Sequence, residues 1–61
     1  MPQNEGYIVE FIAVGNAVKV TALDPHSLKE VSIVGDKKAS QEQLTQLAIR
    51  KLNYVLGKEN S

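Results

Sequence analysis

The sequence predicts an α+β domain in which a three-stranded antiparallel β-meander is followed by one C-terminal helix packed on one face of the sheet (β-β-β-α). Three observations support this prediction. Runs rich in β-branched residues occupy the first half of the 61-residue chain, and turn signals separate them. A long segment with helical apolar spacing then closes the chain. A chain of this length, residues 1–61, is expected to form a single domain.

The first two strands are predicted to form a hairpin with a two-residue turn. Residues 7–14 are rich in β-branched and aromatic side chains, which fit a pleated sheet. Gly15 and Asn16 follow, and a type II′ turn suits them because glycine tolerates a positive φ. A second strand is expected over residues 17–23. The polar residues 1–6 are expected to be a disordered lead-in.

The second turn is signalled by Asp-Pro-His-Ser at residues 24–27. An Asp side chain accepts hydrogen bonds from backbone amides two residues on, and Pro fixes φ at the next position. We expect a four-residue loop at 25–28. A third strand over residues 30–34 follows, closed by Gly35 and Asp36.

The two predicted turns specify the same core face. A two-residue first loop places Phe11 opposite Val20, and a four-residue second loop places Val20 opposite Ile33. The face that results is almost entirely apolar: Tyr7, Val9, Phe11, Ala13, Val18, Val20, Ala22, Val31 and Ile33. A slip of one residue would instead turn Lys19 and Glu30 inward. We expect Phe11 to be central in the core, because it faces Val20 on the middle strand.

One helix is predicted over residues 41–56, which contain neither Gly nor Pro. Ser40 and Gln43 have the spacing of a capping box at its start, and Gly57 is expected to end it. Its apolar residues form one stripe that is expected to cover the sheet: Leu44, Ala48, Leu52, Val55 and Leu56. Residues 58–61 are expected to be a frayed tail.

Composition excludes several classes of protein. The chain has no Cys and one His, so no disulfide, metal site or cofactor is expected. Seven basic and seven acidic residues give zero formal charge, which argues against a dedicated nucleic-acid binder and against a polybasic membrane segment. No apolar run approaches the ~20 residues of a membrane span, and the polar N-terminus does not resemble a signal peptide. We expect a cytoplasmic protein.

Most of the chain is similar to a known family. The residues that carry this similarity are 6–16 (GYIVEFIAVGN), 18–22 (VKVTA) with Asp24-Pro25, 30–36 (EVSIVGD) and 47–56 (LAIRKLNYVL). They resemble a family of short proteins from alphaproteobacteria that is classed as a domain of unknown function. The resemblance implies a bacterial origin and transfers no functional residue. The family commonly has Gly in the second turn, near the position that Leu28 occupies here.

One group of residues superficially suggests catalysis. His26 lies between Asp24 and Ser27, so an acid, an imidazole and a hydroxyl are close in sequence. A catalytic triad needs such groups to converge in space beside an oxyanion site, which three neighbours on one exposed turn do not provide. We therefore expect a turn histidine, no catalytic residue and no enzymatic activity.

The loop before the helix is a candidate anion site. Lys37 and Lys38 precede Ser40, and a helix N-terminus attracts anions through its free amides and its dipole. The alternative interpretation is a solvated loop that ends in a helix cap. Anion binding here supports a second functional hypothesis, a weak nucleic-acid or phosphate-binding domain.

The leading hypothesis is a non-catalytic interaction module that forms a homodimer. A core this small yields roughly 3–5 kcal/mol, and without disulfide or metal a partner chain is the remaining source of stability. The first strand is long, has no proline, and carries one charge, so it offers an unprotected edge. The residues expected in the interface are Ile8, Glu10, Ile12, Val14, Leu23 and Val34. Two arrangements are open: pairing of the two first strands, or packing of the two outer sheet faces.

Overall fold

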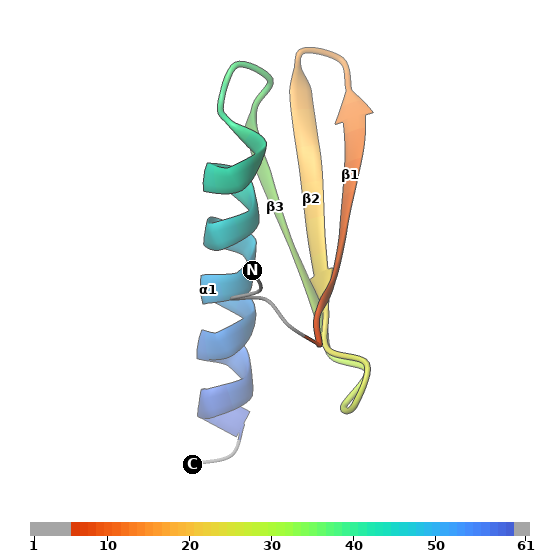
Figure 1. Ribbon diagram of the computed structural model, residues 1–61, viewed down its shortest axis with the longest axis vertical. Coiled ribbons are helices and arrows are strands. Elements are labelled where there is room, and N and C mark those ends of the chain that lie inside the picture. The colour runs from red at the N-terminus through yellow and green to blue at the C-terminus, as the bar shows by residue number, and fades with distance from the viewer. Residues whose placement is uncertain (1–5, 60–61) are drawn as a thin grey trace.

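Figure 1 shows the computed structural model, which describes residues 6–59. The elements in chain order are β1 (Ile8–Val14), β2 (Ala17–Leu23), β3 (Glu30–Asp36) and α1 (Gln41–Glu59). The strands are antiparallel in the order β1-β2-β3, with α1 packed against the sheet, so the predicted β-β-β-α architecture is confirmed. Most of the expected lead-in and part of the tail, residues 1–5 and 60–61, lie outside the described residues.

The observed register is the predicted one. Phe11 pairs with Val20, and Val20 pairs with Ile33. Val14 pairs with Ala17, so Gly15 and Asn16 alone form the first turn. The φ angle is +61° at Gly15 and is not positive at Asn16, which is the sign pattern of a type II′ turn.

The second turn has the predicted four-residue loop and one strained residue. The Asp24 amide donates to the Lys29 carbonyl at 2.9 Å, and the Leu28 amide donates to the Asp24 carbonyl at 2.8 Å. Leu28 has φ +63°, the left-handed region in which a Cβ atom crowds the following carbonyl. This is the turn in which glycine was expected from the family resemblance, and leucine bears the strain here.

The prediction that β3 ends at residue 34 is wrong, because the strand continues to Asp36. Val18 pairs with Gly35, and Ala17 pairs with Asp36. β3 therefore pairs with the whole length of β2. Gly35 and Asp36, which were expected to close the strand, form the last two pairs of the ladder.

The prediction that α1 ends at residue 56 is also wrong, because it continues through Gly57 to Glu59. Gly57 does not adopt a positive φ, so it does not form the left-handed cap expected of it. A glycine inside a helix destabilises it by about 1 kcal/mol relative to alanine. α1 nevertheless continues past Gly57 for two more residues. At the other end of the chain, β1 begins at Ile8, one residue later than expected.

The core is centred on β2 and α1. Val20 and Leu52 are fully buried, whereas Phe11 is only half-buried. The buried set is Val20, Ala22, Leu44, Ala48 and Leu52. α1 packs mainly on β2 and β3, and β1 lies farthest from it (Figure 1). The expectation of a central Phe11 is therefore wrong, because the helix lies to one side of the sheet.

Candidate functional site

The free edge of β1 presents backbone groups that have no hydrogen-bond partner among residues 6–59. In a two-residue hairpin the pair next to the turn, Val14 and Ala17, exchanges both hydrogen bonds. Alternation along the ladder then turns the N–H and C=O groups of Val9, Phe11 and Ala13 away from β2. Within residues 6–59, no hydrogen bond outside the ladder reaches these groups.

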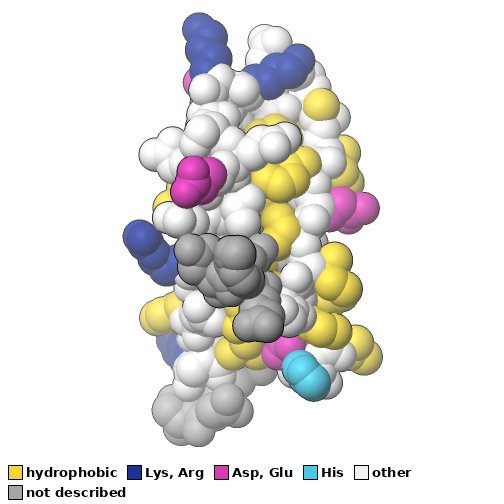
Figure 2. All heavy atoms as spheres, in the orientation of Figure 1, with side chains coloured by type: hydrophobic (Ala, Val, Ile, Leu, Met, Phe, Trp, Pro, Cys, Tyr) yellow, Lys and Arg dark blue, Asp and Glu magenta, His cyan; other side chains and the backbone are white. Residues whose placement is uncertain are grey.

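The outward side chains of β1 are exposed as well. Ile8 is 55% exposed, Ile12 45% and Val14 57%, and Glu10 is the one charged residue of the strand. Figure 2 shows hydrophobic side chains gathered along the β1 side of the molecule. Apolar side chains of this size in a row beside an open backbone edge are typical of an interface.

The opposite edge, on β3, is partly covered. The Lys51 Nζ donates to the Ser32 carbonyl at 2.9 Å, and the Asp36 carbonyl accepts from the Ala39 amide at 2.9 Å. Both carbonyls belong to residues whose backbone groups point away from β2. The edge of β3 therefore has side-chain and loop partners of its own, and α1 lies beside it.

A polar row divides the outer sheet face. Glu10, Thr21 and Ser32 lie side by side across the three strands, and the Thr21 and Ser32 hydroxyls are 2.9 Å apart in a hydrogen bond. The apolar residues expected to form one patch are therefore divided. Ile8 and Leu23 lie on one side of the row, Ile12 and Val14 lie on the other, and Lys19 separates Ile12 from Val34. Two outer faces packed together would have to bury this polar row.

Hydrogen bonds to the side chains of Asp24 and Ser27 stabilise the turn between β2 and β3. One carboxylate oxygen of Asp24 accepts from the His26 amide at 3.1 Å, and the other accepts from the Ser27 hydroxyl at 3.1 Å. The Ser27 oxygen in turn accepts from the Lys29 amide at 3.2 Å. These hydrogen bonds use the backbone of His26 and not its imidazole, so they shape the turn without orienting the ring.

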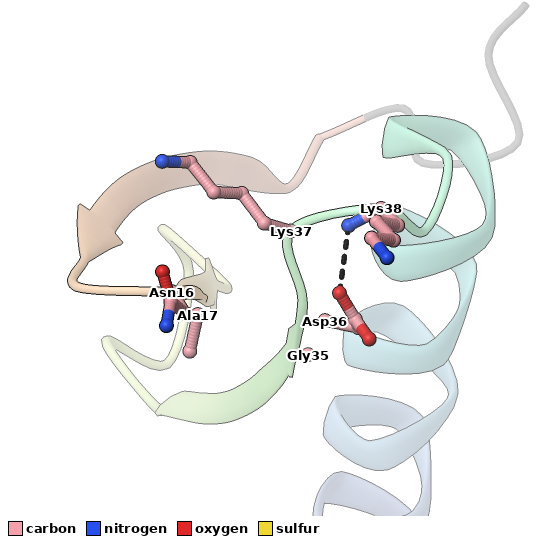
Figure 3. Close-up of a pocket in the computed structure, with 6 residues that line it drawn as sticks. All are labelled: Asn16, Ala17, Gly35, Asp36, Lys37 and Lys38. Carbon is pink, nitrogen blue, oxygen red and sulfur yellow. Dashed lines mark hydrogen bonds between the residues drawn. The ribbon is translucent and has the colours of Figure 1, made fainter.

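The predicted anion-site residues lie near a shallow hollow (Figure 3). Its volume is about 560 Å³, and it is lined by Asn16, Ala17, Gly35, Asp36, Lys37 and Lys38. The Lys37 side chain extends toward β1, whereas the Lys38 side chain lies on the α1 side, so the two ammonium groups diverge. An Asp36 carboxylate oxygen accepts from the Lys38 amide at 2.8 Å and places negative charge beside the hollow.

Ser40 is the N-cap of α1, as predicted. Its hydroxyl oxygen accepts from the Gln43 amide at 3.0 Å. The Ala39 amide is already bonded to the Asp36 carbonyl, so two amides that an anion would need have partners within the chain. The structure thus gives Ser40 a capping role and does not bring Lys37 and Lys38 together around it.

Sequence analysis missed two contacts made by α1. Lys51 reaches the edge of β3, and Asn53 accepts a hydrogen bond of 2.5 Å from the Tyr7 hydroxyl. Both residues adjoin Leu52 in sequence, and the apolar stripe alone gave no signal for Asn53, which was expected on the opposite face of the helix. One contact joins α1 to β3, and the other joins it to Tyr7, the residue before β1.

The described part of the chain offers neither a metal site nor a membrane span. Residues 6–59 contain no group of three His, Cys, Asp or Glu side chains placed to hold a metal ion. Over the same residues, the single helix is too short in apolar length to cross a bilayer.

Residues 4–59 match the family model of a domain of unknown function, DUF6898. The match spans every strand and the helix. Comparison with the curated proteins and with the solved structures finds no match.

Proposed function

We propose that this chain, which belongs to the DUF6898 family, is a non-catalytic interaction module that forms a homodimer by pairing the β1 edges of two copies. The observation that supports the proposal is the unequal protection of the two sheet edges. Natural proteins usually block an edge strand with charge, proline, a bulge or a covering element. Here Lys51 and the loop at Asp36 engage two outward carbonyls of β3, and no such contact is made to β1 within residues 6–59.

Pairing about a two-fold axis would use both open edges at once. The product is one antiparallel six-stranded sheet, with a β3 strand at each end. Because Lys51 occupies part of each remaining edge, the assembly stops at two chains instead of growing into a fibre. A second copy is thus a partner that satisfies the edge without creating a new one.

The competing arrangements receive less support. Packing of the two outer faces would bury the row formed by Glu10, Thr21 and Ser32, so we prefer strand pairing. Phosphate or nucleic-acid binding at Lys37, Lys38 and Ser40 is the second candidate, and the engaged amides make it weaker. The alphaproteobacterial origin and the cytoplasmic location stay predictions.

Two proline variants test the proposal by blocking one edge at a time. Ala13 and Val34 are both exposed residues whose amides point away from β2, on β1 and β3 respectively. A proline at such a position removes an edge donor without breaking an internal ladder bond. Sedimentation over a concentration series should show a dimer for the parent and for Val34→Pro, and a monomer for Ala13→Pro.

Circular dichroism of each variant establishes that it is folded. If Ala13→Pro is unfolded, a synthetic chain with an N-methylated Ala13 amide removes the same donor without the ring. A dimer that persists in a folded Ala13 variant would overturn the proposal. So would a parent chain that remains monomeric at the highest concentration of the series.

A further inference from the structure

We infer that the two-fold axis of the β1 pairing passes beside Phe11, so that Phe11 of one copy lies opposite Phe11 of the other. This inference rests on the proposed homodimer and specifies which residues meet in it. It follows from the phase of the β1 ladder, the position of Glu10 and the exposure of the outward side chains.

The ladder phase limits the possible registers. The residues of β1 whose N–H and C=O groups face the open edge are Val9, Phe11 and Ala13. In an antiparallel dimer each hydrogen-bonded pair joins two such residues. With the axis beside Phe11, Val9 pairs with Ala13 of the partner subunit, Phe11 with the partner's Phe11, and Ala13 with the partner's Val9. All the open groups of these three residues are then satisfied.

Moving the axis by one residue satisfies fewer groups. An axis beside Glu10 pairs only Val9 with Phe11 inside the strand and places the two Glu10 side chains directly opposite each other, which is destabilising. An axis beside Ile12 pairs only Phe11 with Ala13, because Val9 would then face Gly15 in the turn.

The side chains favour the same register. On the outer face, Glu10 lies opposite the partner's Ile12, so the two carboxylates are separated. Ile8 lies opposite the partner's Val14, and these are the two most exposed large hydrophobic side chains of β1, at 55% and 57%. Pairing brings them into contact and removes apolar surface from water.

The inner face gives a further reason. Phe11 is only half-buried because α1 packs mainly over β2 and β3. Directly opposed aromatic side chains on one face of a sheet stabilise strand pairing. A second Phe11 across the axis would cover the part of the ring that the helix leaves exposed.

Disulfide trapping tests the register, because the chain has no cysteine of its own. In the inferred register Glu10 and the partner's Ile12 form a non-hydrogen-bonded pair, whose Cα separation of about 4.5 Å suits a disulfide. Chains carrying Glu10→Cys are mixed with isotopically labelled chains carrying Ile12→Cys and oxidised. Mass spectrometry should find that most of the linked dimer is the mixed species. A mixture of Ile8→Cys and Val14→Cys chains should behave in the same way.

The controls separate failure of the register from failure of the dimer. Gln46→Cys, at an exposed position on α1, measures linkage by random collision when it is mixed with the Glu10→Cys chain. Preferential linkage of Glu10→Cys to itself, or of Ile12→Cys to itself, would overturn the register and leave β1 pairing intact. Linkage no faster than with Gln46→Cys, in samples that sediment as dimers, would overturn both proposals.

Discussion

β1 and β3 are edge strands of equal length in the same sheet, yet within residues 6–59 only β3 has outward backbone groups with partners outside the ladder. The carbonyls of Ser32 and Asp36 on β3 have partners from α1 and from the connecting loop, and the helix lies beside that strand. The outward backbone groups of β1 have none among residues 6–59. The contrast teaches that in a meander with one helix, the lateral position of the helix decides which edge stays available.

The largest predicted effect concerns the core beneath the helix. Leu52→Ala removes a fully buried side chain and should cost about 2–5 kcal/mol, comparable with the whole stability of so small a domain. Phe11→Ala should cost less, because Phe11 is only half-buried in the monomer. Urea unfolding at low protein concentration measures both. A larger loss for Phe11→Ala would place the core centre on β1 and contradict the asymmetry.

A glycine on β3 tests how closely the helix approaches that strand. A Cβ atom at Gly35 would overlap the Leu44 Cδ2 atom, and Leu44 is buried, so Gly35→Ala should cost about 1–3 kcal/mol. Gly57→Ala is the matched control. A Cβ atom added at Gly57 would meet no atom within 4 Å, and Gly57 lies in the helix. The substitution Gly57→Ala should therefore stabilise the protein by about 0.5–1 kcal/mol. Equal effects from the two substitutions would contradict the close approach of α1 to β3.

The loop between β2 and β3 contains backbone strain at Leu28 that a substitution can remove. Leu28→Gly should raise the free energy of unfolding by up to about 1 kcal/mol, because glycine accepts φ +63° without the Cβ conflict. Leu28→Ala keeps the Cβ atom and should not produce this gain. Thermal unfolding of both variants measures the difference, and a gain with alanine as large as with glycine would assign the effect to the exposed leucyl side chain instead.

The smallest effect on stability is expected at Lys51. Lys51→Met removes the ammonium group from the Ser32 carbonyl on an exposed edge and should change the free energy of unfolding by only about 0.5 kcal/mol. It should nevertheless open the second edge and allow association beyond the dimer, detected by light scattering. Arg50→Met makes the same charge change on a neighbouring exposed position and should leave association unchanged. Equal association of the two variants would show that Lys51 does not protect β3.

Local chemistry was sufficient to predict much of the fold. Gly15-Asn16 and the turn at Asp24 each determine a loop length, and together they place Phe11, Val20 and Ile33 in one row. Ser40 was likewise predicted as the helix cap from its spacing alone. These features depend on residues within one turn of each other, which a sequence displays directly.

The difference between the β1 and β3 edges was harder to predict from the sequence. The lateral position of α1 depends on packing between residues distant in sequence, such as the close approach of Leu44 to Gly35. The contact from Lys51 to the Ser32 carbonyl follows from that position. Sequence analysis identified β1 as the open edge from its composition, and it placed Phe11 too centrally because apolar periodicity does not say which strands a helix covers.

Amide hydrogen exchange of the full chain, followed by NMR over a dilution series, shows whether the β1 edges of two copies pair in solution. At high concentration the amides of Val9, Phe11 and Ala13 should exchange slowly, and dilution should accelerate them together as the dimer separates. The amide of Val34, on the edge of β3, should exchange rapidly throughout. If the three β1 amides exchange as rapidly as that of Val34 at every concentration, β1 is not a paired edge and the account is contradicted.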